Sequence, residues 1–115
     1  MAKAIDKFFA TTTGKNVQLG VVIGQAQLAA SVIKVPGREP IRRDDSFTLD
    51  LGPGEQLAGK MLVCSTLVTD RRDETNDTSI SMKVSDGVTA LEASRQEAAK
   101  RNGGSVTYVI VLRCT

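Results

Sequence analysis

The sequence predicts an all-β, mainly antiparallel fold, a β-sandwich of about six or seven strands that forms a single domain over residues 1–115. Three observations predict it. Apolar and polar residues alternate in several segments, as they do in strands that are buried on one face. Glycine, proline, asparagine and aspartate separate these segments at short intervals. A chain of 115 residues with 41% apolar and 24% charged residues suits one globular domain with a modest core.

The N-terminal part of the chain is expected to hold three elements. Residues 1–9 are expected to form an edge strand or a short helix, with Ile5, Phe8 and Phe9 packing inward. Residues 17–35 contain no charged residue before Lys34, and a glycine interrupts their apolar pattern near the middle. This segment is predicted to form two strands joined as a hairpin, either buried or in contact with another subunit.

Two segments in the middle of the chain alternate with a period of two. Their inward-facing residues are predicted to be Phe47, Leu49 and Leu51 in the first, and Ile80, Met82 and Val84 in the second. Residues 60–69 and 106–114 differ, because valine, isoleucine and leucine occur in both phases. Strands of this kind lie in the middle of a sheet or at a contact between subunits, where both faces are covered.

Residues 89–102 break the alternating pattern before the last strand. Thr89 and Glu92 have the spacing of a capping box, strong helix formers follow, and Asn102 begins a glycine-rich stop signal. The segment therefore predicts a short surface helix, and an irregular crossover between the last two strands is the alternative.

The composition excludes several kinds of chemistry. The chain contains no histidine and no tryptophan, and its only aromatic residues are three phenylalanines and one tyrosine. Histidine is the side chain that titrates nearest neutral pH and the commonest metal ligand, so histidine-based catalysis and His-zinc sites are excluded. Few aromatic faces remain to stack on bases or sugar rings. We therefore expect no catalytic residues, no cofactor and no enzyme activity.

The two cysteines, Cys64 and Cys114, both lie in apolar strand-like segments. We expect two buried free thiols, because free cysteine is among the most buried residue types. A disulfide would need an oxidising compartment, and two thiolates without histidine make an incomplete metal site. The N-terminus has no apolar signal segment, and no long charge-free apolar stretch could cross a bilayer, so the expected location is the cytoplasm, with no membrane partner.

An acidic loop over residues 70–77 is the one candidate for a metal site. Asp70, Asp73 and Asp77 could supply oxygen ligands to Ca²⁺ at one end of the sandwich. Arg71 and Arg72 oppose this interpretation, and a solvated turn with internal ion pairs is the alternative. A calcium-dependent ligand-recognition domain is accordingly the second functional hypothesis.

Two further segments resemble phosphate-binding elements without completing them. Residues 54–60 match G-x-x-x-x-G-K, but Met61 follows where Ser or Thr is required, and a strand-like run replaces the helix. The basic residues of segment 38–43 could contact phosphates, yet the net charge is only +2 and acidic residues adjoin them. Neither nucleotide nor nucleic-acid binding is expected.

The first functional hypothesis is therefore a non-catalytic structural or interaction domain that self-associates. More strand positions are apolar on both faces than a two-layer sandwich of this length can bury. Such surplus apolar surface commonly meets another subunit, so the expected partner is a protein and the expected assembly a homo-oligomer.

Overall fold

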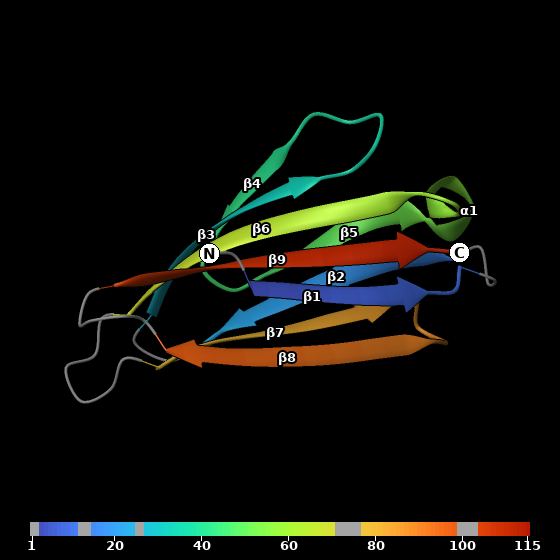
Figure 1. Cartoon of the computed structure of the whole chain (residues 1–115). Helices are drawn as coiled ribbons and strands as arrows, with labels where there is room; N and C mark the ends of the chain where they lie inside the picture. Colours follow the sequence, from blue (N-terminus) through green and yellow to red (C-terminus); the bar gives the residue numbers. More distant parts are fainter. Residues whose placement is uncertain (1–2, 12–14, 25–26, 71–76, 99–103) are drawn as a thin grey trace.

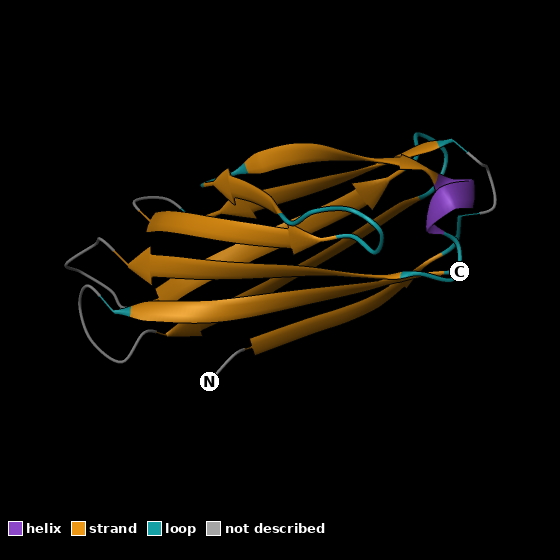
Figure 2. Ribbon diagram, turned by 90° about the horizontal axis from the view of Figure 1, so that it is seen from above, coloured by secondary structure: helices purple, strands orange, loops and turns teal. Residues whose placement is uncertain are grey.

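A computed structural model describes residues 3–11, 15–24, 27–70, 77–98 and 104–115 of the chain. It confirms the all-β class. Two mostly antiparallel sheets pack against each other, and a short helix precedes the last strands (Figure 1). Seen from above, the strands of both layers run roughly along the long direction of the molecule (Figure 2).

The first sheet is five-stranded, with the order β1-β9-β6-β3-β4. Its strands, in this order, are Lys3–Phe9, Ser105–Cys114, Met61–Asp70, Gln27–Lys34 and Ile41–Asp44. The pairing of β1 with β9 is parallel, and the other pairings are antiparallel. The two long strands with apolar residues in both phases, β6 and β9, are therefore neighbours in the middle of the sheet. This is one of the two positions predicted for them, the other being a contact between subunits.

The second sheet is four-stranded, with the order β5-β2-β7-β8. Its strands, in this order, are Phe47–Pro53, Asn16–Ile23, Asp77–Ser85 and Ala90–Ala98. All of its pairings are antiparallel, and the register between β2 and β5 shifts between Val17 and Gln18.

The core lies between the two sheets and follows the two-residue alternation. Of the inward-facing residues predicted for β5 and β7, Leu49, Leu51, Ile80, Met82 and Val84 are buried, and Phe47 packs against them from a half-buried position. The facing side chains of the other sheet are mainly aliphatic as well. The largest of the fully buried side chains are Tyr108, Phe9, Ile33, Leu51 and Leu57.

Residues 1–9 contribute an edge strand, one of the two predicted alternatives. Ile5 and Phe9 are buried as expected, but the prediction for Phe8 is wrong, because this side chain is 68% exposed. In a strand, consecutive side chains point to opposite faces, so Phe8 and Phe9 cannot both enter the core.

The two strands predicted within residues 17–35 form, but they do not form a hairpin. β2 pairs with β5 and β7 in one sheet, whereas β3 pairs with β4 and β6 in the other. The chain therefore crosses from one layer to the other between these strands. Both strands gain hydrogen-bonded neighbours on both sides, which a two-stranded hairpin at a sheet edge would not supply.

The helix or crossover predicted for residues 89–102 is replaced by strand β8 over the described part of that segment. The reason lies in the preceding turn. The Asp86 carboxylate accepts hydrogen bonds from the backbone N–H groups of Val88 and Thr89, and Gly87 adopts a φ of 87°. This turn sends the chain back along β7, so Thr89 ends a hairpin turn instead of capping a helix.

The connection between β5 and β6 contains a one-turn helix, α1 (Gly54–Leu57), which the sequence pattern did not indicate. Leu57 is buried, and the Gly54 amide donates to the Lys15 carbonyl. The described part of the chain contains no helix with the length and apolarity needed to cross a membrane.

Candidate interaction surface

The outer face of the five-stranded sheet carries more apolar side chains than the outer face of the four-stranded sheet. Its strands alternate, so one set of side chains enters the core and the other points away from the second sheet. We use the term aliphatic face for the outward apolar residues of β1, β3, β6 and β9. Phe8 is its one aromatic member, and the others are Ala4, Leu28, Ala30, Val32, Met61, Val63, Leu67, Val109 and Val111. Phe8, Leu28, Met61 and Leu67 are 68%, 50%, 47% and 47% exposed.

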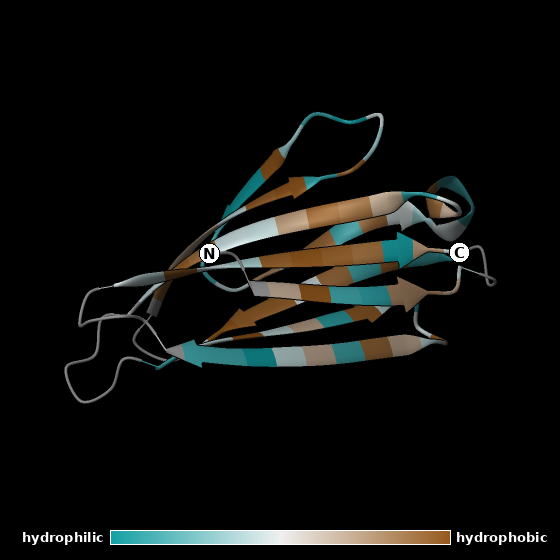
Figure 3. Cartoon of the chain, viewed as in Figure 1, coloured by the Kyte–Doolittle hydropathy of each residue, from teal (hydrophilic) through white to brown (hydrophobic). Residues whose placement is uncertain are grey.

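The residues of the aliphatic face lie in rows that cross the strands. The backbone register places Asp6, Val111, Val63 and Lys34 side by side across four neighbouring strands. The next row consists of Ala4, Val109, Ser65, Val32 and Arg42. In these two rows the middle positions are apolar or small. The first row ends in the charged residues Asp6 and Lys34, and the second ends in Ala4 and Arg42. Figure 3 shows the apolar stretches of β6 and β9 as brown segments in the centre of the sheet.

One end of this face carries a charged pair. The Arg113 guanidinium donates from Nε and Nη2 to the two carboxylate oxygens of Asp6, at 3.0 and 3.1 Å. These hydrogen bonds lower the pKa of Asp6. The Arg113 guanidinium also lies 6.0 Å from the centre of the Phe8 ring, within the range of a cation–π contact. The exposed phenylalanine is thus held at the border of the face by its neighbour on β9.

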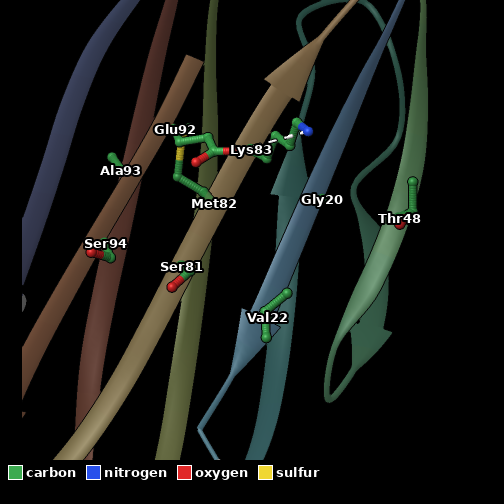
Figure 4. Close-up of a pocket in the computed structure, with 9 residues that line it drawn as sticks. All are labelled: Gly20, Val22, Thr48, Ser81, Met82, Lys83, Glu92, Ala93 and Ser94. Carbon is green, nitrogen blue, oxygen red and sulfur yellow. Dashed lines mark ion pairs between the residues drawn. The ribbon is translucent and has the colours of Figure 1, made fainter. Parts of the chain in front are cut away.

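The outer face of the four-stranded sheet has the opposite character. Its outward side chains are mostly small or polar and include Gln18, Thr48, Asp50, Ser81, Lys83, Ser85, Glu92, Ser94 and Gln96. A shallow depression lies on this face where Gly20 has no side chain, with Val22, Thr48, Ser81 and Ser94 around it (Figure 4). The Lys83 ammonium and the Glu92 carboxylate form an exposed ion pair of 3.7 Å at its border. The polar groups here offer hydrogen bonds and one solvated ion pair.

The free edges of the sheets carry charges. The guanidinium of Arg95 on β8 donates to the Ala4 carbonyl of β1 over 2.7 Å and so links the edge strands of the two sheets. Arg42, Arg43 and Asp44 occupy the short edge strand β4 at the other side of the five-stranded sheet. Charged side chains on edge strands oppose the addition of a further strand from another chain. The face of the five-stranded sheet is therefore a better contact surface than its edges.

The predicted calcium ligands lie at the loop between β6 and β7. Asp70 ends β6 and exposed Asp77 begins β7, whereas Asp73 and the side chain of Asp70 lie outside the described residues. Within the described residues, no group of three or more Cys, Asp or Glu side chains is placed to hold a metal ion. The calcium hypothesis stays a prediction.

Both predicted buried thiols are confirmed. Cys64 and Cys114 are free and buried, at 2% and 3% exposure. Burial raises the pKa of each thiol, because desolvation disfavours the thiolate. Raised pKa values and lack of access are the reverse of what a nucleophilic cysteine needs.

The two phosphate-like segments have structural roles. The glycine-rich segment 54–60 connects β5 to β6 and contains α1. In the basic segment 38–43, the Arg38 guanidinium donates to the Leu51 carbonyl over 2.8 Å. Arg42 and Arg43 follow each other on β4 and so point to opposite faces of the strand.

The sequence pattern identified β6 and β9 as strands with apolar residues on both faces. It did not identify Asp6 and Lys34 as the charged residues at the two ends of the row through these strands. Asp6 and Lys34 are far apart in the chain, and only the register brings them into one row. No match to this chain was found among family models, curated proteins or solved structures.

Proposed function

We propose that this chain is a non-catalytic interaction domain that self-associates through the aliphatic face. The observation that carries the proposal is the contrast between the two outer faces of one sandwich. The outer face of the four-stranded sheet is polar, as expected for a sheet in contact with water. On the outer face of the five-stranded sheet, the outward positions of four neighbouring strands hold the apolar residues of the aliphatic face.

The size of the face supports this function. The four strands have 7, 10, 10 and 8 residues. At about 3.3 Å per residue and a strand spacing of about 4.8 Å they form a surface of roughly 550 Å². This area per partner lies just below the range of standard stable interfaces, where weak and transient contacts occur. The largest apolar patch of a typical monomer covers about 300–600 Å² and is often functional, which makes this face a candidate interaction site. A weak association that dissociates on dilution is consistent with this area.

The composition of the face favours a flat protein surface as the partner. Valine, leucine and alanine project short side chains from a sheet, so two such faces can approach to about 10 Å, the usual distance between packed sheets. The chemistry of the face supplies few hydrogen-bonding groups for a sugar or a nucleotide. A second copy of the chain presents the same aliphatic face and is therefore a flat, apolar partner of this kind.

The decisive experiment is the mass of the protein in solution, measured by light scattering and sedimentation over a range of micromolar concentrations. We expect the unaltered chain to form a dimer that dissociates on dilution. Leu67→Lys places a charge in the middle of the face and should weaken association at least tenfold, because an unpaired ammonium would be buried.

The matched control is Val22→Lys. Val22 is 61% exposed on the outer face of the other sheet, so the same change there should leave the mass unaltered. Circular dichroism of both variants establishes that the fold is retained. A monomeric unaltered chain, or equal effects of the two substitutions, contradicts the proposal.

A further inference from the structure

The charges at the row ends carry an inference about how two copies meet, and it rests on the proposed function. We propose that the two copies pack through their aliphatic faces about a two-fold axis that runs parallel to the strands, midway between β6 and β9. In this arrangement Asp6 of each copy lies beside Lys34 of the partner subunit.

The register of the sheet supplies the geometry. Asp6, Val111, Val63 and Lys34 occupy four consecutive strands in a single row, in the order β1, β9, β6 and β3. An axis midway between β9 and β6 divides this row into equal halves. Rotation about it brings each position opposite its mirror position in the row. Val111 then faces Val63 of the partner subunit, and Asp6 faces Lys34 of the partner subunit.

The next row agrees with the same axis. It places Ala4 opposite Val32 of the partner subunit, and Val109 opposite Ser65 of the partner subunit. Small side chains therefore meet small or medium side chains near the axis. Arg42 lies beyond this pair on β4, outside the overlap of the four central strands. In the row that contains Phe8, the axis places Arg113 opposite Met61 of the partner subunit, and the Arg113 guanidinium stays paired with Asp6 of its own chain.

Other two-fold axes in the plane of the face are less favourable. An axis perpendicular to the strands places each strand opposite the same strand of the partner subunit, so Asp6 never lies opposite Lys34, and an axis through their row would bring like charges together. An axis along β6 places Lys34 opposite Val111 of the partner subunit. Burying an unpaired charge against aliphatic side chains costs far more than an exposed ion pair contributes. Among these three axes, only the one midway between β6 and β9 places Asp6 opposite Lys34 of the partner subunit.

The two charged groups are compatible with a contact across the axis. Asp6 accepts hydrogen bonds from Arg113 in its own chain, and its carboxylate has further acceptor positions. Lys34 is exposed, and the salt bridges among the described residues do not include it. An ammonium from the partner subunit could therefore join the Asp6–Arg113 pair.

The test of this axis is crosslinking between two single-cysteine additions. A chain with Val63→Cys is mixed with a chain with Val111→Cys, the subunits are allowed to exchange, and a short bifunctional thiol reagent is added. Facing sheets about 10 Å apart bring these positions within reach of such a reagent. The natural Cys64 and Cys114 are buried and free, and peptide mapping separates them from the added thiols.

The control mixture combines Leu28→Cys with Val111→Cys. Leu28 pairs with Thr69, six residues along β6 from Val63, so it lies about 20 Å from the row that contains Val63. We expect the heterologous crosslink between positions 63 and 111 and at most a trace between positions 28 and 111. Equal yields in the two mixtures, or no crosslink in either, rule out the proposed axis.

Charge reversal at Lys34 is a second test of the contact between Lys34 and Asp6 of the partner subunit. Lys34→Glu places two carboxylates together at each of the two symmetry-related contacts, and we expect the dissociation constant to rise about tenfold. Lys83→Glu makes the same change in charge on the outer face of the other sheet and should have no effect. If the chain dimerises but Lys34→Glu changes nothing and the crosslink is absent, the axis is wrong and self-association stands. If the chain is monomeric, both proposals fail.

Discussion

The phenol oxygen of Tyr108 lies 2.7 Å from Oγ1 of Thr78, across the space between the two sheets. Oγ1 of Thr78 donates its one proton to the Glu97 carbonyl over 2.8 Å, so the tyrosine hydroxyl must be the donor to Thr78. A second acceptor, the Thr78 carbonyl, is 3.2 Å away. One buried hydrogen-bond chain therefore joins β9 of the first sheet to β7 and β8 of the second.

Removal of the tyrosine hydroxyl should lower stability without altering the packing of the ring. We expect Tyr108→Phe to reduce the free energy of unfolding by about 1–2 kcal/mol, because a buried hydrogen bond is lost. Urea denaturation measures this change. Thr78→Ser keeps the hydroxyl and is the matched control for the hydrogen bond. An unchanged free energy in Tyr108→Phe would show that the inter-sheet hydrogen bond contributes nothing net.

A second buried pair joins two neighbouring strands of the five-stranded sheet. Oγ of Ser31 and Oγ1 of Thr66 are 2.7 Å apart and face each other in the β3–β6 register. Thr66→Val should destabilise by about 1–3 kcal/mol, since it removes the nearest partner of a buried hydroxyl. Thr66→Val combined with Ser31→Ala should cost less than the sum of the single changes. Strict additivity in this double-mutant cycle would contradict a direct interaction.

Alkaline pH should destabilise the fold through its buried acids. Burial raises the pKa of the Cys64 thiol from its usual value of 9.0, and desolvation also raises that of Tyr108 from 10.0. The folded state thus holds these protons more tightly than the unfolded state. Their contribution to stability is complete below pH 9.0 and is lost as the pH rises from there toward the folded pKa values.

Thermal unfolding between neutral pH and pH 11 measures this effect, with a falling midpoint expected above about pH 9. Cys64→Ala should reduce the slope over the lower part of that range, although it also removes some packing. A midpoint that stays flat through this range would mean that the buried thiol and phenol do not control alkaline stability.

The turn between β7 and β8 depends on one carboxylate. Asp86 accepts hydrogen bonds from the N–H groups of Val88 and Thr89, at 2.9 and 2.6 Å. Asp86→Ala should therefore reduce the free energy of unfolding by about 1–3 kcal/mol, since two N–H groups lose a charged acceptor. Asp86→Asn keeps one acceptor oxygen and should therefore lose less of the free energy of unfolding than Asp86→Ala. Hydrogen exchange should accelerate first in β8, and uniform acceleration over both sheets would contradict a local role.

The sequence by itself determined the class of fold and much of its core. Alternation predicted the buried faces of β5 and β7, because a strand places every second side chain on one side of the sheet. Apolar residues in both phases likewise predicted that β6 and β9 lie in the middle of a sheet. The surplus apolar positions on these strands already indicated the outward face that became the candidate surface.

Tertiary structure decided which strands are neighbours. The composition of residues 89–98 favours a helix locally, but a tight turn at Asp86 and the open side of β7 direct the segment into a strand. Helix propensity amounts to less than about 1 kcal/mol per residue, which a full ladder of hydrogen bonds and a packed face outweigh. The same pairing rules separate β2 and β3 into different sheets.

The register decided the candidate surface in detail. The sequence places Asp6 and Lys34 on different strands of unknown pairing, and a slip of one residue would move either side chain to the other face. Only the assembled sheet brings Asp6, Val111, Val63 and Lys34 into one row. Local patterns determine which side chains can be buried, whereas long-range pairing determines which of them stand side by side.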